Sequence, residues 1–168
     1  MELQQIDKTQ YRRHLNMASI VAIAVMIFFA LIYAQILIQF FADGEGSNFR
    51  FNLIGVILAV ITAVIGFNLS KSHPYLYEVK YVWDLKQLHN KIYRKLHHVK
   101  KAAETNDVDA LIILNYYYQA SKQLYTLDNN TLTMDSLLTD IARLERQIET
   151  NHLDINLSDF NIGLLGKF

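Results

Sequence analysis

Two uninterrupted apolar stretches dominate the first half of the chain. Residues 17–42 and residues 51–69 contain no Asp, Glu, Lys or Arg. Helices over these stretches would measure roughly 39 Å and roughly 28 Å, against a hydrocarbon core of about 30 Å. A buried core helix is the alternative, but little else in the sequence could cover two such helices side by side. We therefore predict two transmembrane helices, and no cleaved signal peptide, since the first stretch exceeds a signal core of about 7–15 residues.

The charged residues beside the two stretches predict their orientation. The short polar segment 43–50 between them carries one basic residue, Arg50, and two acids. Basic residues flank the opposite ends of both stretches: Lys8, Arg12, Arg13, Lys71 and Lys80. Because flanking Lys and Arg favour the cytoplasmic side, we expect both termini to be cytoplasmic. Residues 1–16 would then form a cytoplasmic N-terminal arm, and residues 43–50 a short external turn, periplasmic in a bacterium.

Small residues recur along the second stretch at helical spacing, as Gly55, Ala59, Ala63 and Gly66. Apolar side chains alone give helices little reason to associate inside a bilayer, whereas small residues permit the close approach that does. We therefore predict that these four residues form the packing seam of a two-helix hairpin. The alternative is that one such stripe brings two copies of the chain together.

Residues 74–104 predict one long amphipathic helix after the second span. Pro74 suits the first turn of a helix, where its missing N–H is not needed. Apolar residues then recur every three or four positions, as expected for one face packed against a neighbour. This predicted seam consists of Tyr81, Leu85, Leu88, Ile92, Leu96, Val99 and Ala103.

Two further helices are predicted after the long one. Asn106 is the expected N-cap of a helix that runs to about Tyr125 and is apolar on most sides, as a central helix would be. An amphipathic helix follows, and residues 74–151 would together form a cytoplasmic helical domain. The tail, residues 152–168, either packs back on this domain or touches the membrane. The predicted fold class is all-α, a two-helix transmembrane hairpin followed by a cytoplasmic three-helix bundle or antiparallel helical domain.

The net charge is zero, but it is unevenly distributed. Residues 71–104 hold eight Lys and Arg against three acids, and residues 105–168 hold four against nine. A candidate basic stripe lies along the predicted long helix: Lys91, Arg94, Lys95, His98 and Lys101. Nucleic acid or anionic lipid would need this stripe to be uncompensated. Because the acidic segment can neutralise the stripe in part, we expect residues 81–101, taken as a whole, mostly to face their own domain.

The sequence contains no motif for catalysis, metal binding or cofactor binding. Without Cys there is no thiolate nucleophile and no Cys-based zinc site. His89 and His97 would be about 12 Å apart along a helix, and His97 and His98 diverge around it, so neither pair can share an ion. A phosphate-binding Gly-rich loop and a nucleophile elbow are also missing. We therefore predict no enzymatic activity, no metal and no cofactor.

The first turns of the predicted long helix carry more aromatic and apolar residues than one helical neighbour can cover. Trp83 lies about 160° from Tyr81 at 100° per residue, so it points away from the seam. We predict a second contact here, with another copy, a partner protein or the headgroup region. The candidate interaction surface consists of Tyr75, Tyr77, Val79 and Trp83.

Three stretches resemble a family of uncharacterised, small two-span inner-membrane proteins of gammaproteobacteria. The stretches are IDKTQYRRHLN before the first span, HPYLYEVKYVWDLKQLHNKIYRKL after the second, and DALIILNYYYQASKQLYTLDNNTLT. The resemblance implies a bacterial inner-membrane location. It implies no active-site residues, because the family has no assigned activity.

The sequence thus predicts a non-enzymatic inner-membrane protein whose cytoplasmic helical domain mediates protein–protein interaction or self-association. The predicted partners are the lipid bilayer and either a second copy of the chain or another membrane or cytoplasmic protein. The alternative is contact between the basic stripe and anionic lipid headgroups. Nucleic-acid binding by that stripe is less favoured, because an acidic block follows the basic one directly.

Overall fold

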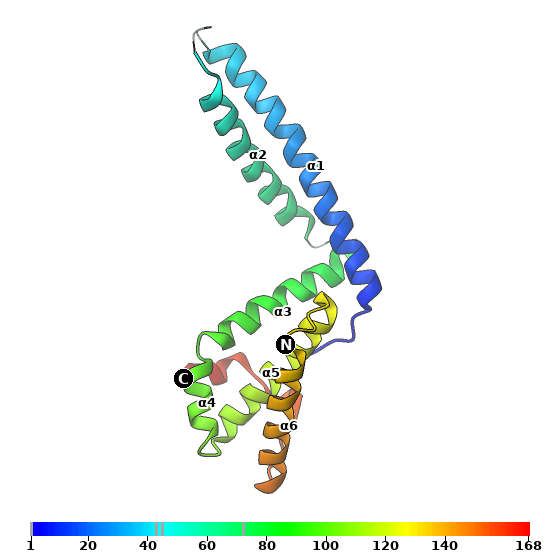
Figure 1. The fold of residues 1–168 in the computed structure, drawn as a ribbon, viewed down its shortest axis with the longest axis vertical. Coiled ribbons are helices and arrows are strands. Elements are labelled where there is room, and N and C mark those ends of the chain that lie inside the picture. Colours follow the sequence, from blue (N-terminus) through cyan, green and yellow to red (C-terminus); the bar gives the residue numbers. More distant parts are fainter. Residues whose placement is uncertain (1, 43, 45, 72) are drawn as a thin grey trace. The chain divides into compact units, whose positions relative to one another are not determined.

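The computed structural model describes residues 2–42, 44, 46–71 and 73–168. All regular structure in this described part is helical, which confirms the predicted all-α class. The chain divides into two compact units, residues 9–80 and residues 81–168 with residues 2–8. The elements in chain order are α1 (Lys8–Phe41), α2 (Phe49–Ser70), η1 (Pro74–Leu76), α3 (Tyr77–Tyr93), α4 (Leu96–Ala103), α5 (Val108–Asp128), α6 (Met134–Thr150), η2 (Leu157–Asp159) and η3 (Ile162–Lys167) (Figure 1).

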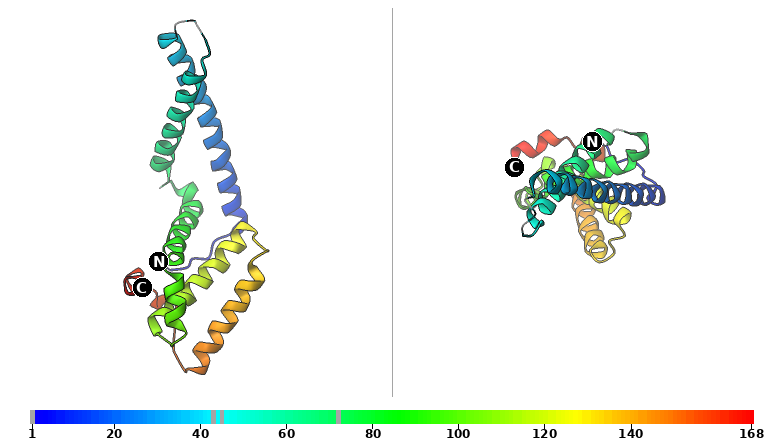
Figure 2. Two further views of the ribbon diagram at one scale, coloured as in Figure 1. Left: turned by 60° about the vertical axis from the view of Figure 1, so that its left-hand side comes forward. Right: turned by 90° about the horizontal axis from the view of Figure 1, so that it is seen from above.

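Helices α1 and α2 form an antiparallel hairpin (Figures 1 and 2). They contain 34 and 22 residues, and the mean hydropathies of their most apolar 18-residue segments are 2.7 and 2.4. Both helices are therefore long and apolar enough to span a membrane. Helix α1 begins at Lys8, well before the predicted start of the span. In the connection, Gly44 and Gly46 have φ values of +81° and +83°, which glycine adopts without steric cost. Asp43 and Glu45 of the predicted turn lie outside the described residues.

Helix α5 is the central element of the second unit, which we call the helical domain. It packs against α4, α6, η2 and η3. Its side chains Leu111, Ile113 and Tyr116 are at most 1% exposed, as expected for a helix that is apolar on most sides. Helix α6 instead is amphipathic and buries Leu137 and Leu144 on one face.

The start of α5 differs by one residue from the prediction. Asp107, not Asn106, is the N-cap, and its carboxylate accepts a hydrogen bond of 2.9 Å from the amide of Ala110. Asn106 adopts a left-handed conformation with φ of +59° and ends the preceding turn. Asn is one of the few residues other than glycine that tolerate this conformation, which explains both roles of the Asn-Asp pair.

The single long helix predicted over residues 74–104 is wrong, because the structure divides it into η1, α3 and α4. The chain turns at Arg94 and Lys95, where the amide of Lys95 bonds to the carbonyl of Ile92 at 2.9 Å, three residues back. Lys95 has φ −108° and ψ 0°, outside regular helix. Neither Pro nor Gly marks the break. The change of direction allows α4 to pack against α5. One consequence is that Leu96, a predicted seam residue, is only partly buried.

The C-terminal tail packs back on the helical domain, which settles the alternatives left open by the sequence. The ring of Phe160 stacks on Tyr116 with centroids 3.9 Å apart, and Phe160 is 7% exposed. Leu165 is also buried, and its carbonyl accepts a hydrogen bond of 2.6 Å from Lys95 Nζ. Burial of two such side chains contributes about 1.5–3 kcal/mol each.

The first residues of the chain, 2–8, group with the helical domain. The amide of Gln4 donates to the Tyr81 hydroxyl at 2.8 Å, and the carbonyl of Gln4 accepts from Gln123 Nε2 at 2.5 Å. The Tyr81 hydroxyl in turn donates to Gln123 Oε1 at 3.2 Å. This closed ring of three hydrogen bonds fixes the N-terminal segment beside α3 and α5.

Candidate functional site

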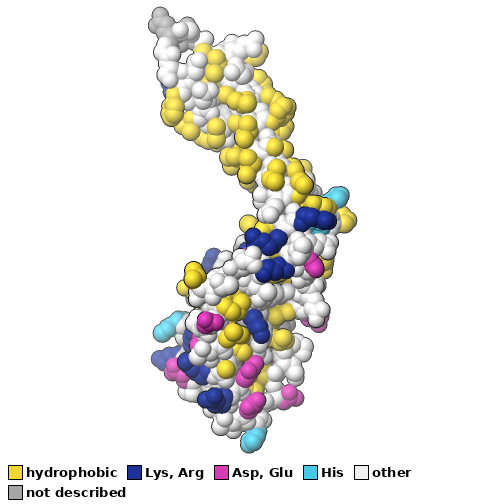
Figure 3. All heavy atoms as spheres, turned by 45° about the vertical axis from the view of Figure 1, so that its right-hand side comes forward, with side chains coloured by type: hydrophobic (Ala, Val, Ile, Leu, Met, Phe, Trp, Pro, Cys, Tyr) yellow, Lys and Arg dark blue, Asp and Glu magenta, His cyan; other side chains and the backbone are white. Residues whose placement is uncertain are grey.

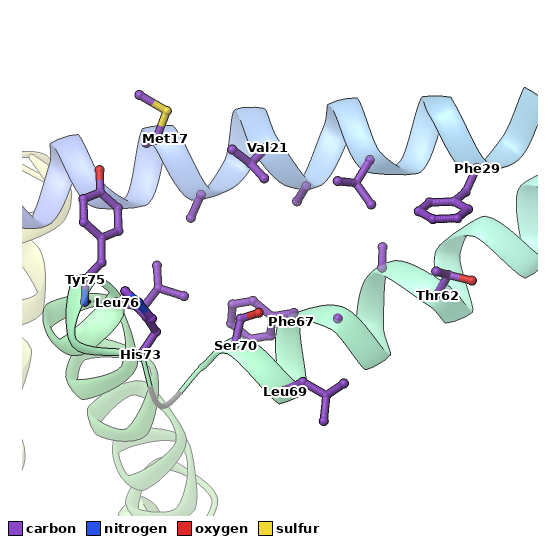
Figure 4. A pocket seen from close by; sticks show the side chains of 15 residues that line it. Met17, Val21, Phe29, Thr62, Phe67, Leu69, Ser70, His73, Tyr75 and Leu76 are labelled. Carbon is purple, nitrogen blue, oxygen red and sulfur yellow. Dashed lines mark hydrogen bonds between the residues drawn. The ribbon is translucent and has the colours of Figure 1, made fainter.

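The main cavity of the hairpin is an apolar wedge between α1 and α2, with a volume of about 740 Å³ (Figure 4). The helices separate towards the hairpin end at which residues 17 and 70 lie. Val21 reaches into the wedge from α1 and Phe67 from α2. Phe29 and Thr62 lie at the opposite end, where the helices approach each other. The wedge can accept an apolar ligand, because hydrocarbon covers most of its walls.

The open end of the wedge has a polar rim made of Ser70, His73 and Tyr75. Pro74 follows His73 and begins η1, and the His73 ring accepts a hydrogen bond of 3.2 Å from the Tyr75 amide through Nδ1. The Tyr75 ring lies against the ring of His14 on α1, with centroids 4.0 Å apart. The turn after α2 therefore positions polar groups at one end of an otherwise apolar cavity.

A histidine–carboxylate contact lies beside this rim. His14 Nδ1 is 2.9 Å from Glu78 Oε2, and His14 is 5% exposed. The pair joins α1 to the first turn of α3, within residues 9–80. The Glu78 carboxylate is therefore held by a histidine at the edge of the wedge.

At its narrow end the wedge closes on a tight helix contact. A Cβ atom at Gly55 would lie 2.8 Å from the Ala34 nitrogen and 3.0 Å from the Ala30 carbonyl oxygen, so only glycine fits without displacement. Ala59, one turn further along α2, is fully buried. Two of the four predicted packing residues thus lie in the hairpin contact, where close backbone approach supplies the dispersion attraction.

The other two predicted packing residues do not close the seam. A Cβ atom at Gly66 would meet nothing within 4 Å, so the prediction of helix packing is wrong for this residue. Ala63 is partly buried, and both line the wedge. Ala18 and Ala22 line it from α1. The small residues that face each other across α1 and α2 were the signal in the sequence for the wedge. Where the helices lie apart, small side chains leave space that larger ones would fill.

A hydrogen bond between side chains joins α1 to α2. The Tyr33 and Thr62 hydroxyl oxygens are 2.9 Å apart. The Thr62 hydroxyl already donates to the Leu58 carbonyl at 3.0 Å, so the proton in the shared bond belongs to Tyr33. In a hydrocarbon environment this bond adds direction to a contact that otherwise depends on packing.

The candidate interaction surface is only partly exposed. Tyr77 and Trp83 are 52% and 55% exposed on α3, and Tyr75 is 40% exposed at the rim of the wedge. Val79 is only 8% exposed, so its assignment to this surface is wrong. The reason is helical spacing: Val79 lies three residues before Val82, which belongs to the buried face of α3.

The candidate basic stripe is divided by the break between α3 and α4. Lys95 leaves it, because its ammonium group is held by the Leu165 carbonyl. Among the described residues, no ion pair joins the stripe to an acid, so any neutralisation by the acidic segment does not come from direct pairing. Asp109 pairs with Lys167 and Asp128 with Lys86 instead. The remaining stripe residues are exposed: Lys91, Arg94, His98 and Lys101.

A Ser–His pair that the sequence did not indicate lies between α3 and α5. His89 Nε2 is 2.8 Å from Ser121 Oγ, and the Ser121 hydroxyl donates to the Tyr117 carbonyl at 2.7 Å. The serine proton is therefore committed, and His89 donates from Nε2. Burial lowers the pKa of His89, which favours this neutral form. A catalytic dyad needs the opposite polarity, with histidine accepting the serine proton, and Ser121 is only 1% exposed.

Three consecutive tyrosines on α5, Tyr116, Tyr117 and Tyr118, are all buried. Burial raises the pKa of each to about 12, so all three stay neutral at physiological pH. Tyr117 stacks on His89 with centroids 4.5 Å apart, and Tyr116 stacks on Phe160. They therefore serve as packing and stacking groups of the domain core.

The family model described as "Protein of unknown function (DUF3087)" matches residues 1–165. The match covers the hairpin and nearly all of the helical domain. Neither a curated protein nor a solved structure matches the chain.

Proposed function

We propose that this chain, which belongs to DUF3087, a family of proteins of unknown function, is a two-span bacterial inner-membrane protein. Both termini and the helical domain would lie in the cytoplasm. The domain would act by protein–protein interaction, including self-association, and not by catalysis. The observation that supports the membrane location is the exposure of the hairpin. In the most apolar 18-residue segments of α1 and α2, only 6% and 11% of the residues are buried.

The apolar surface of the hairpin supports this proposal. Ile20, Phe28 and Leu31 on α1 are each at least 60% exposed, and similar side chains surround α2. Figure 3 shows apolar side chains gathered over the hairpin, whereas charged side chains gather over the helical domain. A soluble monomer rarely exposes apolar patches of more than a few hundred Å². A bilayer covers such a surface without any protein partner.

Alkaline extraction of membranes from expressing cells tests the membrane part. The chain should stay in the pellet and dissolve only with detergent, because about 20 apolar residues per span hold it in the hydrocarbon core. Release into the supernatant at alkaline pH would contradict the proposal. Ile27→Asp is an informative variant, since a carboxylate at mid-span costs about 2.5–3.5 kcal/mol and should weaken insertion.

The interaction part rests on the exposed aromatic side chains Tyr77 and Trp83 on α3. Aromatic residues are enriched at protein interfaces, where their large area is buried at low entropic cost. Size-exclusion chromatography with light scattering in detergent tests self-association through this face. We expect a dimer that Trp83→Ala weakens, and that Tyr93→Ala, a matched change at an aromatic residue 63% exposed ten residues further along α3, leaves intact. A monomer for the unmodified chain would contradict self-association.

The exposed stripe residues Lys91, Arg94, His98 and Lys101 favour a second candidate, contact with anionic lipid headgroups. Each Lys or Arg near an anionic surface contributes about 1 kcal/mol and is screened by salt. Co-sedimentation of the chain cannot report this contact if the hairpin itself inserts. Salt-dependent protection of Lys91 and Lys101 from acylation, in anionic but not zwitterionic vesicles, would support it. Equal protection in both would exclude it.

A further inference from the structure

We propose that the wedge between α1 and α2 holds one acyl chain of an anionic phospholipid, whose phosphate is bound by cations at the open end. This inference rests on the proposed membrane location, since a phospholipid reaches the wedge only from a bilayer. It adds a ligand and a defined binding site to the hairpin.

The dimensions of the wedge match one leaflet. It extends along α1 from Met17 to Phe29, a distance of roughly 18 Å at 1.5 Å per residue. One leaflet contributes half of a hydrocarbon core of about 30 Å, so roughly 15 Å. The wedge therefore begins at the same end as the flanking charges and ends near the bilayer midplane, where Tyr33 and Thr62 join the helices.

The narrowing of the wedge selects a chain thinner than a helix. A helix with its side chains is at least about 10 Å wide. The wedge narrows to the contact between Gly55 and Ala34, where there is no room for a third backbone. If the wedge were empty, the side chains that line it would lose dispersion contacts. Water does not stabilise such an apolar space. A single hydrocarbon chain is thin enough for the narrow end of the wedge and fills its apolar space.

The charge at the open end selects the headgroup. Residues 9–16 and 70–80 contain four Lys and Arg and one acid, Glu78, whose carboxylate contacts His14. Arg13 is exposed one helical turn before Met17, and Lys71 directly follows Ser70 of the rim. Lys71 Nζ bonds to Asn68 Oδ1 at 3.1 Å and keeps two further donors for a phosphate. The tyrosine hydroxyl and the imidazole of the rim add further hydrogen-bonding groups at the depth of the headgroups.

Photolabelling of the full chain in lipid nanodiscs tests the site. The probe is phosphatidylglycerol with a diazirine in the middle of one acyl chain, present at low fraction in phosphatidylcholine. The matched probe is phosphatidylcholine that carries the same diazirine. We expect labelling of wedge residues such as Phe29 and Thr62 to exceed that of the lipid-facing Ile65, with phosphatidylglycerol favoured.

Gly66→Phe should fill the wedge without disturbing the fold, because a Cβ atom there meets nothing within 4 Å. We expect it to lower labelling inside the wedge by about fivefold, the change that corresponds to about 1 kcal/mol. Ile65→Phe, at a neighbouring residue 54% exposed to lipid, should leave labelling unchanged. Arg13→Gln and Lys71→Gln should each lower the preference for phosphatidylglycerol by about fivefold while the wedge stays open.

Several outcomes would overturn the inference while the membrane location holds. They are equal labelling by the two probes, labelling of Phe29 no stronger than that of Ile65, or a crosslink to a second copy in place of lipid. A chain that fails to enter nanodiscs and is released by alkali would overturn the proposed membrane function together with the lipid site. The two failures are distinguishable, because incorporation is measured before illumination.

Discussion

The contact at Gly55 leads to the sharpest prediction about the hairpin. In Gly55→Ala the new Cβ atom would lie 2.8 Å from the Ala34 nitrogen, whereas ordinary contact begins at 3.4 Å. The helices must therefore move apart by about 0.6 Å at this point, and a gap of this size forfeits about a quarter to a half of the dispersion attraction of the affected atoms. Overpacking of this kind costs about 1–3 kcal/mol. We expect the hairpin to lose stability by that amount.

Gly66→Ala is the matched control, because it makes the same substitution in the same helix without a clash. The intrinsic preference of helices for Ala over Gly, about 1 kcal/mol, applies to both variants and cancels in the comparison. The chain has no native Cys, so two introduced Cys residues can carry a donor and an acceptor dye. Ile36 and Leu53 are suitable positions, since both side chains are nearly half exposed.

The assay is a titration of SDS into bicelles, with hairpin opening read as loss of energy transfer between the dyes. Gly55→Ala should open at a lower SDS fraction than Gly66→Ala, and Gly66→Ala should match or exceed the unmodified chain. If Gly55→Ala is as stable as Gly66→Ala, the close approach of α2 to the Ala34 backbone does not hold the hairpin together.

Three further predictions concern single contacts. Tyr33→Phe removes the donor to Thr62 and leaves no group unsatisfied, so the same titration should show a loss of only about 0.6 kcal/mol; a loss above about 2 kcal/mol would contradict this. Phe160→Ala removes the buried tail contact and should cost the helical domain about 3–5 kcal/mol in thermal unfolding, whereas Ile162→Ala, at a residue 49% exposed, should change little. Because the folded-state pKa of His89 is lowered, its stabilising contribution is complete above the unfolded value of about 6.5 and is lost as pH falls below it; His89→Phe should reduce the acid sensitivity of thermal unfolding.

The helical class and the hairpin could be predicted from the sequence because their signals are local. Charge-free stretches long enough for a bilayer need no tertiary context, and neither does the apolar periodicity of α3 and α5. The close contact at Gly55 followed from the same reasoning, since small residues mark where helices can approach. Gly66 follows the same pattern without making the contact, because the spacing of small residues does not encode where two helices diverge.

The break at Arg94 and Lys95 could not be predicted, because no breaker residue is present. Its cause is tertiary: α4 gains contact with α5, and Lys95 gains the Leu165 carbonyl, a partner 70 residues away. The His89–Ser121 pair is equally non-local, since its members lie on different helices. Acids pair with Lys86 and Lys167 and not with the basic stripe. This choice of partners also depends on side-chain positions, which net charge does not encode.

The accessibility of single cysteines in intact cells tests the membrane topology most directly. A Cys introduced at Ser47, in the exposed connection between α1 and α2, should react with a membrane-impermeant maleimide from outside the inner membrane. A Cys at Ser136, exposed on α6, should react only after the membrane is permeabilised. Reaction of both positions from the same side, or protection of Ser47→Cys alone, would contradict a two-span hairpin with a cytoplasmic helical domain.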